Sequence, residues 1–100
     1  MNDDDFGFVP PPFRPDEALQ RLRRELRALG LTEREGRFER RGSAIARAAI
    51  DGAVLQAALV RRPVRSSPEW QPRALGSSAQ VRDFVAELKQ RLAAWGDAED

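Results

Sequence analysis

The chain of 100 residues contains no cysteine and no histidine, and these absences exclude whole classes of chemistry. Without cysteine there is no disulfide framework, no thiolate nucleophile and no iron–sulfur or zinc-finger centre. Without histidine there is no imidazole metal ligand, no Ser-His-Asp relay and no side chain that ordinarily titrates near neutral pH. Tyrosine is also absent, and Lys89 is the one lysine that a Ser–Lys dyad could use. We therefore expect a protein that is not an enzyme and holds no cofactor and no metal ion.

The near-neutral total charge conceals three regions of different charge. The chain has 17 basic and 16 acidic residues, which gives a formal net charge of +1. Residues 1–13 carry three aspartates and no basic residue, and residues 97–100 carry three more acidic residues. The segment between them holds all 17 basic residues against 10 acidic ones, so its charge is +7. Such a basic body attracts nucleic acid, anionic ligands or an acidic partner, although 16 arginines beside 15 alanines also indicate the codon usage of a GC-rich, bacterial genome.

No segment is long and apolar enough to cross a membrane. The longest weakly charged stretch, residues 48–60, has 13 residues and includes Asp51, whereas a spanning helix needs about 20 apolar residues. The N-terminus is acidic and proline-rich, which is the opposite of the basic start and apolar run of a signal peptide. We therefore expect a soluble cytoplasmic protein with no membrane contact.

The two ends of the chain are predicted to be tails on a single α+β domain, residues 15–96. Residues 1–14 are acidic and contain three successive prolines, which favours an extended, disordered segment. Its three phenylalanines are Phe6, Phe8 and Phe13. They form either a recognition motif for another protein or a patch that folds back on the domain. Residues 97–100 are the acidic C-terminal tail.

Residues 15–30 carry the pattern of a helix that lies on a core. Pro15 suits the first helical turn, and the acidic pair Asp16 and Glu17 suits the positive end of the helix dipole. Leucines recur at spacings of three and four and form one apolar stripe: Leu19, Leu22, Leu26 and Leu29. Gly30 then offers a left-handed stop.

Residues 77–96 carry a second helical pattern. Ser77 or Ser78 caps this helix, and Ser77 with Gln80 fits the capping box. The apolar stripe consists of Val81, Phe84, Val85, Leu88, Leu92 and Trp95. Since Trp95 continues this stripe, we expect it to be structural, and we expect the helix to end at Gly96.

Residues 43–62 admit two interpretations. Read as a helix, this alanine-rich segment makes the protein an all-α three-helix domain. Read as two strands, it turns at Asp51 and Gly52, because Asp-Gly is a favoured two-residue hairpin turn. Folding the chain there places Ile50 opposite Ala53 and gives a hairpin with one wholly apolar face, as expected of a sheet that packs on helices. We favour the hairpin.

The remaining segments complete a small sheet. Residues 36–41 are predicted to be the preceding strand, turning at Gly42, and residues 70–75 a short edge strand in a proline-rich region. The predicted fold class is α+β with the order α-β-β-β-(β)-α, a small antiparallel sheet with the N- and C-terminal helices packed on one face.

The segment 61–73 is the candidate binding surface. Its predicted contact residues are Arg61, Arg62, Arg65, Trp70 and Arg73. Guanidinium groups bind phosphate or carboxylate through two hydrogen bonds, and a loop tryptophan stacks on a base or on a partner's side chain. The other interpretation is that Trp70 packs as a lid on the core and the arginines face solvent.

Two other patterns, one of glycines and one of carboxylates, predict no binding or catalytic site. Gly30, Gly36 and Gly42 are six residues apart and do not form a phosphate-binding loop. The densest carboxylates alternate with arginines and are predicted to be a solvated, internally paired surface: Glu33, Glu35 and Glu39.

Two functional hypotheses follow. The first is a non-enzymatic protein–protein interaction or self-association module, whose partner is another protein or a second copy of the chain. It is motivated by the uncovered sheet face and the aromatic tail. The alternative is an anion- or nucleic-acid-binding module that uses the arginines and tryptophan of segment 61–73.

Overall fold

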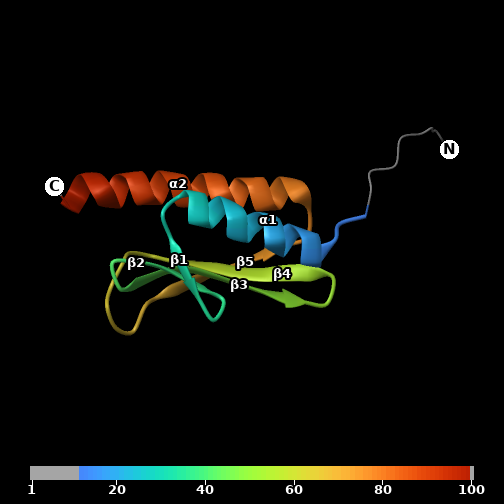
Figure 1. Cartoon of the computed structure of the whole chain (residues 1–100), viewed down its shortest axis with the longest axis horizontal. Coiled ribbons are helices and arrows are strands. Elements are labelled where there is room, and N and C mark those ends of the chain that lie inside the picture. The colour runs from blue at the N-terminus through green and yellow to red at the C-terminus, as the bar shows by residue number, and fades with distance from the viewer. Residues whose placement is uncertain (1–11, 100) are drawn as a thin grey trace.

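Two helices and five strands make up the described part of the protein. The structure is a computed structural model and describes residues 12–99 (Figure 1). The elements are, in chain order, α1 (Pro15–Ala28), β1 (Thr32–Arg34), β2 (Arg37–Arg40), β3 (Ser43–Asp51), β4 (Val54–Val60), β5 (Trp70–Leu75) and α2 (Ser78–Glu99). The predicted α+β fold is confirmed. The all-α alternative is wrong, because residues 43–62 form two strands and their adjoining turns.

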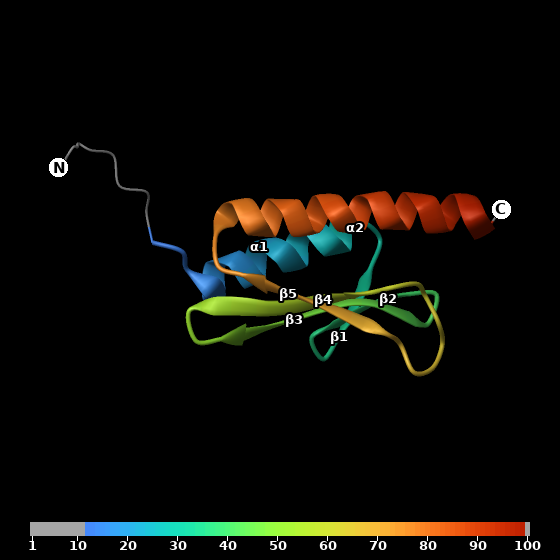
Figure 2. The same ribbon diagram turned by 180° about the vertical axis from the view of Figure 1, so that it is seen from behind.

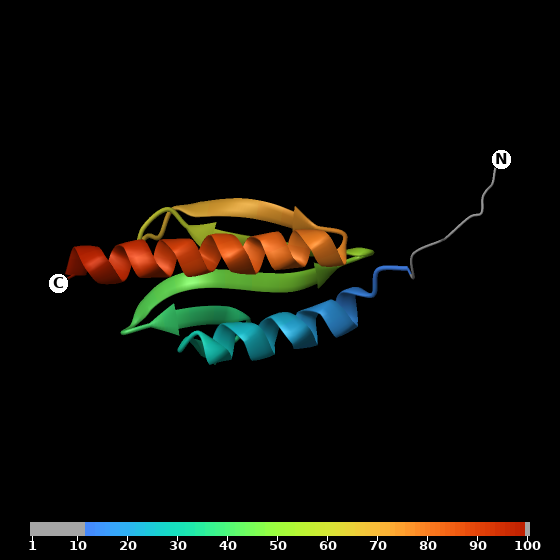
Figure 3. The ribbon, with the colours of Figure 1, turned by 90° about the horizontal axis from the view of Figure 1, so that it is seen from above.

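The strands form one antiparallel sheet in the order of the chain, β1-β2-β3-β4-β5. Both helices lie on the same face of this sheet, as Figures 1 and 2 show from opposite sides. Figure 3 looks down on the helices side by side; α1 packs on β1, β3 and β4, and α2 packs on β5. Neither of the two described helices lies on the other face of the sheet, which we call the open face.

The two predicted apolar stripes close over the sheet and form the core. In α1, Leu22 and Leu26 are fully buried, and the outer leucines of the stripe pack against them. In α2 the first four members of the stripe are buried, while Leu92 and Trp95 pack partly buried against the core. The sheet contributes its largest buried side chains from β2, β3 and β4: Phe38, Ile45, Leu55 and Leu59. The structural role predicted for Trp95 is confirmed.

The predicted serine cap of α2 is found at Ser77, but the return bond from Gln80 goes to Gly76 and not to the N–H of Ser77 that the capping box uses, and the helix ends later than predicted. Ser77 Oγ accepts the backbone N–H of Gln80 at 3.1 Å, and Gln80 Oε1 accepts the backbone N–H of Gly76 at 2.6 Å. The end predicted at Gly96 is wrong, since α2 continues to Glu99. A glycine inside a helix costs only about 1 kcal/mol, and this is too little to force a stop.

The predicted N-terminal tail, residues 1–14, lies almost wholly outside the described residues. Of its three phenylalanines, Phe13 alone is described, and its side chain packs partly buried against the core. At the other end, residues 97–99 belong to α2, and Asp100 lies outside the described residues. Neither of the two described helices has an apolar stretch long enough to span a bilayer.

The β3–β4 hairpin turns at Gly52 and Ala53, one residue later than predicted. Ile50 pairs with Leu55, so the expected pairing of Ile50 with Ala53 is wrong. Gly52 has φ +62° and Ala53 does not have a positive φ, which is the type II′ arrangement with glycine at the first central position. The actual register differs from the predicted one by two residues. Because side chains alternate with a period of two, the apolar face still points to the helices.

The hairpins on either side of β2 use a second kind of turn. Glu35 and Gly36 have φ values of 53° and 79°, and Arg41 and Gly42 have values of 54° and 80°. Positive φ at both central residues is typical of the type I′ turn, which matches the twist of the strands. The strand predicted over residues 36–41 is therefore found as β2, flanked by these two turns.

Both edges of the sheet are unsuited to pairing with another strand. β1 has three residues, of which two are charged. Just before β5, the N–H of Arg61 donates to the carbonyl of Glu69. Because hydrogen-bonded and non-hydrogen-bonded pairs alternate along an antiparallel pair of strands, this bond determines which residues of β5 direct their N–H toward β4. Pro72, opposite Ala58, then occupies a position where an N–H would point away from β4. Since proline has no N–H, the outer edge lacks a donor at its centre.

Candidate ligand-binding face of the sheet

Three arginines stand directly opposite one another across the first three strands. Arg34 of β1 pairs with Arg37 of β2, and Arg37 pairs with Arg47 of β3. Their side chains belong to the open face, because the alternate residues Glu33 and Phe38 contact α1 and the core. We call these three residues the arginine row.

The charge of the arginine row is not neutralised within the described part of the protein. Like charges directly opposite each other in a sheet are destabilising. None of the ion pairs between described side chains involves a member of the row, although Glu35 and Glu39 lie in the neighbouring turn and strand. Three unneutralised guanidinium groups in adjacent strands are suited to an anion that carries several charged oxygens.

Trp70 lies beside this row on the same face. The guanidinium carbon of Arg47 is 4.6 Å from the centroid of the Trp70 ring, and that of Arg37 is 5.9 Å from it. Both distances are within the range of a cation–π contact. The tryptophan itself is partly buried and pairs with Val60 of β4. The structure therefore joins an aromatic ring to two members of the arginine row.

A hollow of about 650 Å³ opens at this point. The β1–β2 turn and the β4–β5 loop border it, and both project from the sheet on the side away from the helices (Figures 1 and 2). Arg37 and Arg47 line it together with Gln56, Pro68 and Trp70. Glu35 of the β1–β2 turn lines it as well, so the hollow combines two guanidinium groups, one carboxylate, an aromatic ring and a side-chain amide.

The structure separates the residues of the predicted binding surface. That prediction comprised Arg61, Arg62, Arg65, Trp70 and Arg73. The first three lie exposed in the β4–β5 loop, where Arg61 is 3.6 Å from the carboxylate of Glu69. Trp70 and Arg73 are three residues apart in one strand and therefore point to opposite faces. Arg73 belongs to the helix side, and Trp70 belongs to the open face.

On the helix side, Arg73 belongs to a charge cluster that links β5 to α2. Its Nε and Nη2 donate to the carboxylate of Glu87 at 3.3 and 3.0 Å, and Arg91 Nη2 donates to the same carboxylate at 2.8 Å. Arg91 Nη1 also donates to Gln71 Oε1 and to the carbonyl of Val60. The hydrogen bond from Arg73 and the two positive charges hold the pKa of Glu87 below its ordinary value, although partial burial acts in the opposite direction. These mutual contacts mark the cluster as structural.

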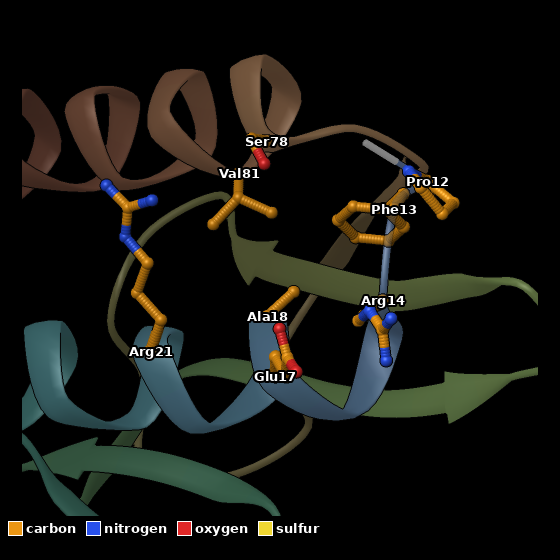
Figure 4. Close-up of a pocket in the computed structure, with 8 residues that line it drawn as sticks. All are labelled: Pro12, Phe13, Arg14, Glu17, Ala18, Arg21, Ser78 and Val81. Atoms are coloured by element: carbon orange, nitrogen blue, oxygen red, sulfur yellow. The ribbon is translucent and has the colours of Figure 1, made fainter. Parts of the chain in front are cut away.

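A second hollow, of about 270 Å³, lies where α1 and α2 begin (Figure 4). Phe13 and Val81 face it from the segment before α1 and from α2, and the charged residues Arg14, Glu17 and Arg21 come from the start of α1 and the residue before it. These charged groups come from one short segment, and the one polar side chain that α2 adds is the hydroxyl of Ser78. We assign this hollow no ligand.

The predicted cluster of carboxylates is also separated. Glu33 accepts hydrogen bonds from Arg23 at 2.9 Å and Arg27 at 3.3 Å, so it joins β1 to α1 rather than pairing with arginines of its own segment. Among the described residues, no three acidic side chains come together as a metal site requires.

The arginine row was missed at the level of the sequence. Arg34 and Arg37 flank a two-residue turn, and the shortest hairpins place such flanking residues opposite each other. This Arg-Glu-Gly-Arg pattern is the signal that could have identified two of the three positions. Comparisons with protein-family models, with curated proteins and with solved structures find no match to this chain.

Proposed function

We propose that this protein is a non-enzymatic binding module that takes the phosphate groups of a nucleic acid on the open face of its sheet. The observation that carries the proposal is the arginine row, three like charges held opposite one another beside Trp70. Like charges in this arrangement weaken a sheet. A bound polyanion neutralises them and removes that cost.

Guanidinium chemistry supports phosphate as the group that is bound. The planar fork of arginine is charged at any physiological pH and matches phosphate oxygens through two hydrogen bonds. Arg62 and Arg65 are exposed in the β4–β5 loop, which projects on the same side of the sheet (Figure 1). They extend the basic surface, in keeping with the charge of +7 between residues 14 and 96. A cytoplasmic location, where nucleic acid is present, is part of the proposal.

The test compares two triple variants that lose the same charge. The first removes the arginine row: Arg34→Gln, Arg37→Gln and Arg47→Gln. The matched control removes three exposed positive charges from the helices: Arg24→Gln, Arg82→Gln and Lys89→Gln. Binding is measured as the fluorescence anisotropy of end-labelled RNA and DNA over a series of salt concentrations.

We expect binding that weakens steeply with salt in the natural protein. The row variant should lower the slope of log K against log salt by about one per arginine. The control should bind nearly as the natural protein does. An equal loss in both triple variants, or no binding by the natural protein at low salt, contradicts the proposal.

A protein partner or self-association, the first expectation from the sequence, is the second candidate. The observation in its favour is Ile50, the one large apolar side chain among the described residues that is strongly exposed, at 49 %. Since both sheet edges are blocked, such a partner would dock through side chains. Light scattering should then give a mass above 11.2 kDa for a self-associating chain, and Ile50→Ser should restore the monomer mass. A monomer mass for the natural protein excludes self-association.

A further inference from the structure

Resting on this proposed function, we infer that the ligand is a single-stranded nucleic acid that stacks one base on Trp70. The hollow on the open face brings together a tryptophan ring, two guanidinium groups and the amide of Gln56. A plain polyanion uses the guanidinium groups alone. A nucleotide uses all three, because its phosphate binds arginine, its base stacks on an aromatic ring and its base edge accepts or donates hydrogen bonds. The composition of the hollow therefore fits a nucleotide better than a simple anion.

The sheet holds Trp70 in place for such a role. Trp70 is the first residue of β5 and pairs with Val60, and both Val60 and the neighbouring Ala58 are buried. The guanidinium of Arg47 already lies over the ring, at 4.6 Å from its centroid. A base that takes this place on the ring frees Arg47 to bind the adjacent phosphate. Stacking and phosphate binding are thus coupled through one arginine.

A duplex cannot present a base in this way. Its bases are stacked on one another in the interior, and their edges alone are accessible in the grooves. The hollow lies between the β1–β2 turn and the end of the β4–β5 loop, where β2 and β5 are three strand spacings apart, roughly 14 Å. That width admits a single strand that turns one base away from its backbone and into the hollow. A duplex would contact the projecting loops without reaching the ring of Trp70.

The experiment separates base stacking from simple anion binding. The probe is an end-labelled oligouridylate of about 12 nucleotides, a length within the usual range of single-strand sites. The competitors are the same strand without the label, a duplex of equal length and inorganic polyphosphate of matched charge. A second readout is the indole N–H signals in the NMR spectrum of isotope-labelled protein. The chain has two tryptophans, and Trp95, packed against the core on α2, serves as the internal control.

We expect the single strand to displace the probe at concentrations at least about tenfold lower than the duplex or polyphosphate requires. The indole signal of Trp70 should shift on binding, while that of Trp95 should not. Trp70→Leu should weaken binding of the single strand by about tenfold or more, and Trp70→Phe should retain most of it because phenylalanine still stacks. Thermal unfolding of both variants checks that they are folded.

The possible failures are distinguishable. If polyphosphate and duplex compete as well as the single strand, and Trp70→Leu binds normally while the arginine-row variant does not, base stacking is refuted and the proposed function stands. If the natural protein binds none of the three, both fall. If Trp70→Leu does not fold, binding by Trp70→Phe and the indole signals of the natural protein test base stacking instead. An indole signal of Trp70 that does not shift when the single strand is added overturns the inference.

Discussion

Arg73 of β5 and Glu87 of α2 form a two-point contact that fastens the long helix to the edge of the sheet. Two nitrogens of the arginine lie 3.3 and 3.0 Å from the two carboxylate oxygens, and Arg91 binds the same carboxylate from the next turn of α2. The hydrogen bond from Arg73 is the largest of the effects that lower the pKa of Glu87. The folded protein therefore holds this carboxylate in its charged form more strongly than the unfolded chain does.

This contact predicts a stability that depends on pH. Glu87→Gln should lower the free energy of unfolding at neutral pH by about 1 kcal/mol, because the site is partly exposed to solvent. The pKa of the folded state lies below the ordinary value of 4.5. The contribution is thus complete above pH 4.5 and is lost as the pH falls from there through the pKa of the folded state. Urea denaturation at neutral and at acid pH should show the natural protein and the variant converging in acid.

Asp83 supplies the matched control for this prediction. It lies exposed one turn earlier on α2, and no ion pair between described side chains involves it. Asp83→Asn removes the same charge and should leave the free energy of unfolding nearly unchanged at both pH values. A deficit of Glu87→Gln that persists undiminished in acid contradicts the assignment.

The turn between β1 and β2 predicts a stabilising substitution. Glu35 has φ 53°, a left-handed conformation that costs most side chains about 1 kcal/mol and that asparagine tolerates. Glu35→Asn should raise the free energy of unfolding by up to about 1 kcal/mol, measured by urea denaturation. The control is Glu39→Asn, the same chemical change inside β2, where asparagine is unfavourable and stability should fall. A loss of stability in Glu35→Asn would contradict the turn geometry.

The cap of α2 predicts a difference between two adjacent serines. Ser77 accepts the backbone N–H of Gln80, whereas Ser78 is the first residue of the helix. Ser77→Ala should lower stability by about 1 kcal/mol, and Ser78→Ala should leave it unchanged or raise it slightly. Thermal unfolding followed by circular dichroism measures both. Equal effects of the two substitutions would mean that Ser77 is not the cap.

The edge of β5 predicts a change in association rather than in stability. Pro72→Val restores an N–H that points outward from the sheet, at a position where no ladder bond to β4 is gained or lost. We expect the variant to self-associate more than the natural protein, as measured by light scattering over a range of concentrations. Pro63→Val, in the β4–β5 loop, is the control and should not change the mass. An unchanged mass for Pro72→Val would show that proline does not protect this edge.

The helices were predictable because each local signal agrees with the packing. The leucine spacing that ends at Gly30 and the serine cap at residue 77 both correspond to observed contacts. The error at Gly96 has a plain physical cause. One glycine lowers the stability of a helix by less free energy than the other residues of a long helix contribute, so α2 continues past it.

The strands were predictable in position but not in register. Asp51 and Gly52 identified the hairpin, yet a glycine with positive φ can occupy either central position of a two-residue turn. Here it takes the first, and Asp51 remains in β3. β1 was not predicted at all, because three residues without an apolar side chain carry no periodic signal.

The candidate site was predictable only in part, since it depends on an irregularity of the sheet. A β-bulge between Phe38 and Glu39 shifts the pairing of β2 with β3. Without this shift, Arg37 would lie opposite Ala46; with it, Arg37 lies opposite Arg47. No local pattern in the sequence gives the position of the bulge. Sequence reasoning therefore found Trp70 but not the arginines beside it.

The order of the sheet has a consequence for synthesis of the protein. Each strand pairs with its neighbour in the chain, so every pairing closes a short loop and forms quickly. All five strands precede α2 in the chain, and α1 is the one described helix that precedes them. Until α2 packs on the sheet, the leucines of β4 and β5 that are buried in the folded protein are therefore exposed to other chains and to chaperones.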